Sequence, residues 1–157
     1  MSSLTKDRRL ARILALDALY QAEIREQLPA EALALLRDQG WSVTLTEAPG
    51  PGDEAPSDDA VGYATRLVEG FQTHAAEIDE LIDRYAQHWA IERMPVVDKN
   101  LLRLAVYELL WEPGIPTAVV INEAIELAKS LSTEESGRFI NGLLGRVSEN
   151  RSPQGGA

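Results

Sequence analysis

The stretch from residue 119 to residue 147 constrains the fold more than any other part of the chain. It reads VVINEAIELAKSLSTEESGRFINGLLGRV and contains two helical patterns joined by a helix-start signal. The signal is a capping-box pattern, Ser132 with Glu135 three residues later. The apolar residues recur at spacings of three and four, which predicts one stripe on each helix: Ile121, Ala124, Ile125, Ala128 and Leu131 on the first, and Ile140, Leu143, Leu144 and Val147 on the second.

The second of these helices carries two glycines that core packing does not explain. Gly142 and Gly145 lie opposite its apolar stripe at about 100° per residue, and each costs the helix roughly 0.8–1 kcal/mol relative to alanine. Arg138 and Arg146 flank them. An outward face with two glycines and two arginines indicates a surface that a ligand approaches closely.

Four further helical patterns precede this stretch. Thr5 and Ser57 are expected as N-caps, Pro29 as an early residue of the second helix, and Gly40 as the residue that ends it. The pattern that ends at Trp111 is apolar on nearly all sides, which is typical of a central helix. No segment shows a persuasive strand alternation, so the chain is predicted to be all-α. The expected helices are Thr5–Glu26, Glu31–Arg37, Ser57–His88 and Asp98–Trp111.

Proline and glycine divide the chain into a predicted domain arrangement. Residues 89–97, broken by Pro95, are the expected hinge between an N-terminal helical subdomain, 1–90, and a C-terminal one, 91–150. Residues 41–57 are rich in proline, glycine and acids, which predicts an acidic loop, and residues 151–157 are expected to be a disordered tail.

Composition excludes several classes of protein. The 157 residues include no cysteine, which rules out disulfides and thiolate sites. No apolar run reaches the roughly 18 residues of a membrane span and no signal peptide is evident, so a cytoplasmic protein without membrane association is expected. The net charge of −10 is unevenly placed: residues 38–60 carry six acids and no basic residue, whereas residues 1–12 carry four basic residues and one acid.

The sequence shows no catalytic or metal-binding constellation. His74 and His88 are the only histidines and are too far apart for a helical metal pair. Glu123 and Glu126 share a helix face, but no histidine is placed to complete a di-metal site. We therefore expect a protein that is not an enzyme and that uses no metal or cofactor.

The basic start of the first helix is the best candidate for binding an anion. A helix N-terminus carries a partial positive charge, and arginines beside it favour phosphate groups. The residues concerned are Lys6, Arg8, Arg9 and Arg12. Tyr20 and Phe139 could stack on bases of single-stranded RNA. The alternatives are a solvated, frayed N-terminus and aromatic residues that serve core packing.

Four sequence blocks together resemble the NusB family of transcription antitermination factors. They read RRLARILALDALYQ, DKNLLRLAVYELL, IPTAVVINEAIELAKSL and EESGRFINGLLGRV, in that order. The resemblance implies a helical bundle of two packed subdomains with about six to seven helices. It also implies binding of boxA-type single-stranded RNA together with the ribosomal protein NusE, and action in an RNA polymerase antitermination complex on rRNA operons.

The same resemblance implies roles for individual residues. Arg8, Arg9 and Arg12 match phosphate contacts of the family's first helix, with Tyr20 as the neighbouring tyrosine. Residues of the last helix match positions near RNA: Glu135, Arg138 and Phe139. Asp98 matches an acidic residue on the NusE-facing side. Two alternatives stay open, a homodimer that hides the RNA surface and a helical adaptor that binds proteins with little RNA affinity of its own.

Overall fold

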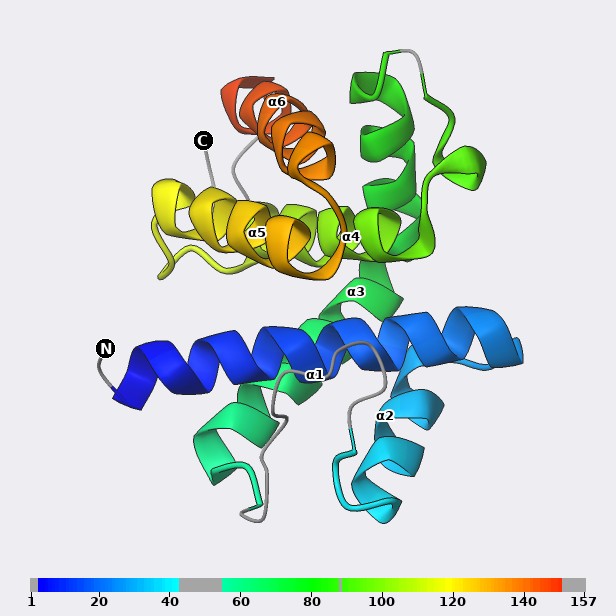
Figure 1. The fold of residues 1–157 in the computed structure, drawn as a ribbon, viewed down its shortest axis with the longest axis vertical. Helices are drawn as coiled ribbons and strands as arrows, with labels where there is room; N and C mark the ends of the chain where they lie inside the picture. The colour runs from blue at the N-terminus through cyan, green and yellow to red at the C-terminus, as the bar shows by residue number, and fades with distance from the viewer. Residues whose placement is uncertain (1–2, 43–54, 88, 151–157) are drawn as a thin grey trace. The chain divides into compact units, whose positions relative to one another are not determined.

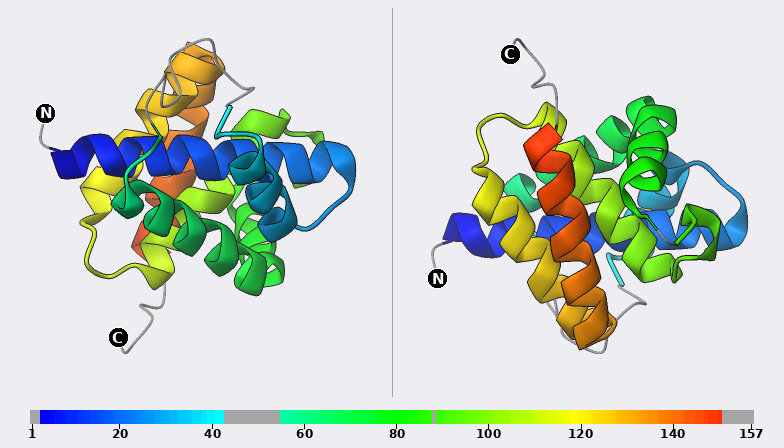
Figure 2. Two further views of the ribbon diagram at one scale, coloured as in Figure 1. Left: turned by 90° about the horizontal axis from the view of Figure 1, so that it is seen from below. Right: turned by 90° about the horizontal axis from the view of Figure 1, so that it is seen from above.

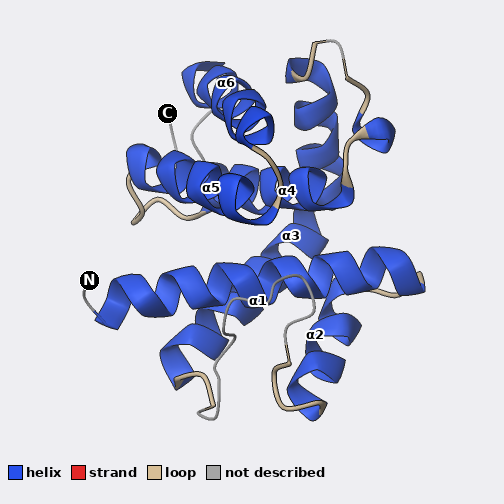
Figure 3. Cartoon of the chain, in the orientation of Figure 1, coloured by secondary structure: helices blue, strands red, loops and turns tan. Residues whose placement is uncertain are grey.

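The computed structural model describes residues 3–42, 55–87 and 89–150. Within these residues the chain forms six α-helices and one short 3-10 helix, with no strand (Figures 1 and 3), which confirms the all-α prediction. None of the described helices is both long and apolar enough to cross a membrane. Most of the predicted acidic loop and the whole predicted tail lie outside the described residues.

The chain forms two compact units, Met1–Gln72 and Thr73–Ala157. The division falls inside α3 (Asp58–Tyr85), upstream of the predicted boundary at residue 90. No loop marks this division, because one helix carries the chain out of the first unit and into the second. The proline and glycine residues of the sequence therefore do not mark the division between the two units.

The first unit consists of α1 (Ser3–Arg25), α2 (Pro29–Asp38) and the first part of α3. Thr5 lies inside α1, so its predicted role as N-cap is wrong. The other end signals are confirmed: Pro29 opens α2, Gly40 follows it with a φ of +75°, and the Ser57 hydroxyl accepts a hydrogen bond from the Ala60 amide at 3.1 Å. Positive φ favours glycine, which explains this residue at the end of α2.

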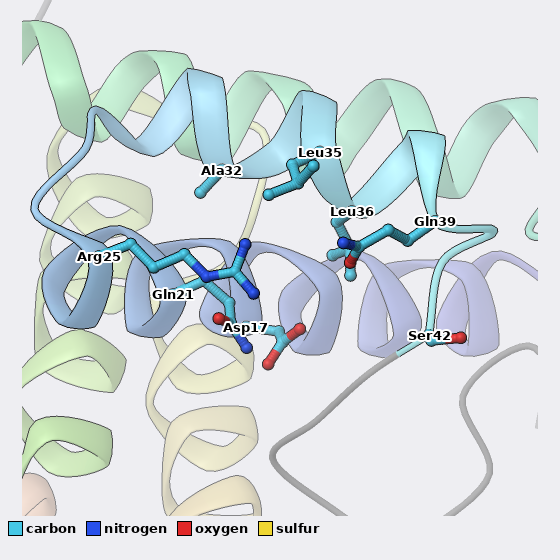
Figure 4. A pocket seen from close by; sticks show the side chains of 8 residues that line it. All are labelled: Asp17, Gln21, Arg25, Ala32, Leu35, Leu36, Gln39 and Ser42. Carbon is cyan, nitrogen blue, oxygen red and sulfur yellow. The ribbon is translucent and has the colours of Figure 1, made fainter.

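α1 and α2 pack against each other, and both helices contain buried leucines, among them Leu14, Leu16, Leu33 and Leu36. Figure 4 shows the small cavity beside this contact, with Asp17, Gln21 and Arg25 entering from α1. Its volume of about 30 Å³ has room for a water molecule or two. It is too small for a nucleobase.

α3 changes direction at His74, whose backbone has non-helical angles of φ −109° and ψ 18°. In the second unit the His74 ring stacks on Trp111, with ring centroids 4.0 Å apart and planes 11° apart. One turn further on, Asp79 accepts two hydrogen bonds from Arg103, both 2.8 Å long. Arg103 thus has the partner that its place on an apolar helix requires.

The second unit continues with a 3-10 turn (Ile91–Arg93), α4 (Val96–Trp111), α5 (Thr117–Leu131) and α6 (Glu134–Asn150). Figure 2 shows α4, α5 and α6 side by side, and each packs against the other two. Eleven of the sixteen residues of α4 are buried, which confirms it as the central helix of this unit.

The predicted apolar stripe matches the buried face of α6 but not that of α5. On α6 the predicted residues Ile140, Leu143, Leu144 and Val147 are at most 1% exposed, as expected. On α5 the buried residues are Val120, Ala124, Leu127 and Ala128, whereas Ile121, Ile125 and Leu131 are half-buried. The buried face of α5 is therefore rotated about the helix axis relative to the predicted stripe. The reason is that α5 packs on both α4 and α6 and has more apolar residues than one face can bury.

Candidate nucleic-acid interface

The basic residues at the start of α1 have different environments. Lys6 is exposed and Arg9 is half-buried. The Arg8 guanidinium lies 3.8 Å from the centre of the Tyr63 ring, and Arg12, only 5% exposed, lies 5.9 Å from the same ring. Arg8 and Arg12 are therefore directed at α3 within the first unit, and Arg12 has little surface to offer a phosphate.

The helical repeat places another set of residues together on α1. At about 100° per residue, Lys6, Arg9 and Tyr20 fall within a sector of about 60°, whereas Arg8 and Arg12 lie on the side of Tyr63. Tyr20 is half-buried. The residues of α1 best placed to face an RNA are thus Lys6, Arg9 and Tyr20.

Removal of the contact between Arg8 and Tyr63 is expected to lower stability modestly. A cation over an aromatic face contributes about 0.5–1 kcal/mol at a partly exposed site, so the coupling between Arg8→Gln and Tyr63→Leu should have this size. Urea unfolding of the two single variants and the double variant measures it. Lys6→Gln is the control, since Lys6 is exposed and should leave the unfolding midpoint unchanged. Strict additivity of the two substitutions would contradict the contact.

The second group of predicted residues lies on α6. Glu135 and Arg138 are exposed, and Phe139 is half-buried with its ring against Trp89. The ring centroids are 5.1 Å apart and the planes meet at 70°, an edge-to-face contact. The two predicted groups thus belong to different units, α1 to the first and α6 to the second.

An open pocket of about 450 Å³ lies beside Phe139, within the second unit. Its residues come from α6 and from the segment that follows α3: Ala86, Gln87, Trp89, Arg138, Phe139, Gly142 and Arg146. This volume lies within the roughly 300–1,000 Å³ of ligand sites. This surface, which we name the α6 pocket, includes Gly142 and both arginines of the sequence prediction, but not Gly145.

Arg146 holds one wall of the α6 pocket in place. Its Nε and Nη2 atoms donate to the Tyr85 carbonyl at 3.0 and 2.8 Å. Tyr85 is the last residue of α3, so the arginine satisfies a carbonyl that the end of a helix leaves unpaired. Gln87, two residues after Tyr85, has a φ of +64°.

The start of α6 is fixed by a cluster of hydroxyls around a buried carboxylate. Thr133 accepts a hydrogen bond from the Ser136 amide at 2.9 Å and is the N-cap. The Ser136 hydroxyl donates to Asp98 Oδ2 at 2.6 Å. Ser132 instead ends α5. The predicted capping box of Ser132 and Glu135 is therefore wrong. The N-cap lies one residue later, at Thr133, because Ser136 is hydrogen-bonded to the buried Asp98 carboxylate.

Asp98 is 0% exposed in this structure, and its part in binding NusE stays a prediction. Asp98 joins α4 to the first turn of α6, the turn that carries Glu135. Its place at the start of α4 agrees with the sequence prediction, whereas its direction toward the interior could not be read from the sequence.

Two aromatic residues of these surfaces do not stand out in the sequence. Nothing in the sequence marks Tyr63 as the partner of Arg8, and Trp89 falls in the predicted hinge. Tyr63 is 5% exposed, and neither its burial nor its pairing with α1 was predicted from the sequence. No group of three or more metal-ligating side chains occurs within the described ranges.

Comparison with known proteins identifies the family. The family model described as the NusB family matches residues 9–149. The chain belongs to the NusB family. It is 47% identical over 142 residues to the transcription antitermination protein NusB of Salinispora arenicola, covering 90% of this chain and 95% of that relative. The Myxococcus xanthus relative of the same name is 46% identical over 140 residues, with 89% and 93% covered.

Solved NusB structures share the fold. The structure of T. maritima NusB is 38% identical in sequence, has a TM-score of 0.78, and 94% of each chain is covered. A second structure, described as antitermination factors NusB and NusE in complex with dsRNA, is 27% identical with a TM-score of 0.76, covering 93% of this chain and 98% of that one. The comparisons confirm the family resemblance and the all-α fold that the sequence motifs implied.

Proposed function

We propose that this protein acts in transcription antitermination by binding boxA-type single-stranded RNA together with NusE. The observation that supports this most directly is the NusB family match over nearly the whole chain, with a structural relative described in complex with NusE and RNA. The proposed setting is an RNA polymerase antitermination complex on rRNA operons in the cytoplasm. The role is one of binding, without catalysis.

Two basic surfaces support RNA binding in a chain whose net charge is −10. The first is formed by Lys6, Arg9 and Tyr20 on α1, and the second by Arg138 and Phe139 on α6 beside the open pocket. Local positive charge, not the sum over the chain, attracts a polyanion. We assign a smaller direct role to Arg8 and Arg12 than the family match implies, because both are directed at Tyr63.

A titration of boxA-type RNA tests the function and the assignment together. The RNA should bind more tightly with NusE present, and a scrambled RNA should bind more weakly. Lys6→Gln with Arg9→Gln should lower the affinity by on the order of tenfold and reduce the salt slope by about 0.7 for each phosphate that is no longer neutralised. Fluorescence anisotropy at several salt concentrations measures both quantities.

Arg8→Gln is the matched control, since it removes the same charge from the neighbouring position. It should change the salt slope less than the double variant does. Equal salt slopes for the double variant and the unmodified protein would refute the assignment of α1. A double-stranded form of the same RNA is included, because the related complex contains dsRNA, whereas we expect the single strand to bind better.

The adaptor alternative gives a different pattern in the same titration. An adaptor binds NusE, and the addition of boxA-type RNA leaves that affinity unchanged. Light scattering of the free protein detects the homodimer, which should dissociate on RNA addition if it covers the RNA surface. A stable dimer that binds RNA without dissociation would show that the two surfaces are separate.

A further inference from the structure

α3 runs from the first unit into the second, and its contacts change within three residues. Gln72 is the last residue of the first unit, and its Oε1 atom accepts a hydrogen bond from the Ala30 amide at 2.9 Å. Ala30 is the second residue of α2, so Gln72 satisfies an amide that the start of a helix leaves unpaired. This bond attaches the end of the first part of α3 to α2.

The His74 side chain attaches the beginning of the second part of α3 to α4. Its ring stacks on Trp111, the last residue of α4, with ring centroids 4.0 Å apart. Trp111 stacks in turn on Tyr107, at 6.0 Å and with planes 16° apart. The Tyr107 hydroxyl donates to the buried Glu112 carboxylate at 2.8 Å. The ring on which His74 stacks is therefore itself held within the second unit.

The backbone of α3 leaves the helical region at the same position. The His74 angles of φ −109° and ψ 18° are non-helical. α3 contains no proline, which would enforce a kink by its own geometry. The division between the units, the change of contacts and the kink thus coincide within residues 72–74.

We propose that residues 73–74 form a hinge between the two units, and that the stack of His74 on Trp111 keeps this hinge in one setting. A hinge absorbs a change of backbone angles in a few residues. The hydrogen bond of Gln72 on one side and the ring of His74 on the other confine that change to this short stretch. The stack is the contact that must break when the hinge moves.

The hinge has a consequence for RNA binding. The basic groups assigned to RNA belong to different units, Lys6 and Arg9 to the first and Arg138 to the second. The setting of the hinge therefore determines the spacing of the two groups, which makes His74 a positioning residue for a bound RNA. This consequence rests on the proposed function, whereas the hinge itself does not.

Spin labels measure the hinge directly in the free protein. The chain has no cysteine, so Asp38→Cys on α2 and Glu126→Cys on α5 place one label on each unit, both at exposed positions. Double electron–electron resonance gives the distribution of distances between the labels. The distribution should broaden in His74→Ala, and His74→Phe, whose ring can stack on Trp111, should restore the original width. Trp111→Leu should broaden it as well, and no further when combined with His74→Ala, because both remove the same stack.

Two controls separate the hinge from a general loss of stability. Labels at Glu126→Cys and Glu149→Cys both lie in the second unit, and their distance distribution should be the same in every variant. Tyr107→Phe is the matched control, since it removes the hydroxyl that bonds to Glu112 but keeps the ring. It should lower the melting temperature without broadening the distribution between the units.

Titration of boxA-type RNA in the presence of NusE tests the positioning role. The affinity should fall by on the order of tenfold in His74→Ala, the result expected when the binding-competent setting is populated about a tenth of the time. His74→Phe should restore the affinity, and Tyr107→Phe should leave it unchanged. Added RNA should narrow the distance distribution between the units in His74→Ala.

Each contrary result overturns a stated part of the inference. An unchanged distribution in His74→Ala, or an equal broadening in Tyr107→Phe, would refute the hinge. A broadened distribution with unchanged RNA affinity would refute the positioning role. Absence of RNA binding by the unmodified protein with NusE would refute the proposed function and the positioning role together, while the distances in the free protein would still decide the hinge.

Discussion

Asp98→Ala is expected to lower the free energy of unfolding by about 2–3 kcal/mol. The substitution removes the charged acceptor of the Ser136 hydroxyl, a buried hydrogen bond of 2.6 Å, and a hydrogen bond to a charged group contributes about 1.5–3 kcal/mol. Since Asp98 is 0% exposed, the change also leaves a small cavity between α4 and α6. Urea unfolding monitored by circular dichroism measures the decrease.

A double-mutant cycle with Ser136→Ala separates the hydrogen bond from the cavity. The coupling energy should be about 1.5–3 kcal/mol, and the variant lacking both groups should be more stable than the sum of the single effects predicts. Asp98→Asn is a milder control, because the amide oxygen still accepts from Ser136. RNA affinity should fall with Asp98→Ala, since the first turn of α6 carries Glu135. An Asp98→Ala variant with unchanged stability would refute the view that the Asp98–Ser136 hydrogen bond stabilises the contact between α4 and α6.

Arg103→Met is expected to lower the free energy of unfolding by about 1–2 kcal/mol. The guanidinium makes a two-fold contact with Asp79 and a third with the Asn100 side chain at 3.0 Å. The arginine and aspartate side chains are 17% and 32% exposed, so we place the effect between those of exposed and buried pairs. For a chain of this size the melting temperature should fall by roughly 2–8 °C.

The pair of Arg84 and Glu80 provides the control, because it has the same chemistry at an exposed site. Its side chains are 57% and 70% exposed, and Arg84→Met should change stability by less than about 0.5 kcal/mol. Arg103→Lys should recover only part of the stability, since an ammonium cannot make the two-fold contact. Equal effects at Arg84 and Arg103 would show that the burial of the Arg103 pair contributes nothing.

Helix identity and most helix ends could be predicted from the sequence because they depend on neighbouring residues. Ser57, Pro29 and Gly40 act within one turn of the helix ends they mark. Two local predictions, the capping box before α6 and the apolar stripe of α5, failed because contacts with residues distant in the sequence decide them. At the start of α6 a serine-glutamate pattern competes with a threonine-serine pattern one residue later, and the buried Asp98 selects the second.

Candidate site residues were predictable by type but not by environment. The basic start of α1 was evident, whereas the separation of Arg8 and Arg12 from Lys6 and Arg9 depends on Tyr63, more than fifty positions away. The exposure of Gly142 on α6 followed from the helical repeat, whereas Gly145 is half-buried. The pocket beside Gly142 did not follow from that repeat, because Trp89 reaches Phe139 only through the tertiary fold.

The hydrogen bonds from Arg146 to Tyr85 have a consequence for synthesis of the chain. The first unit ends at Gln72, so all of its sequence leaves the ribosome while the second half is still being translated. The last carbonyl of α3, by contrast, acquires this partner only when residue 146 emerges, near the end of α6. Domains generally fold as units during synthesis, N-terminal first. A chain whose translation stops before Arg146 therefore lacks the side chain that pairs with the last carbonyl of α3.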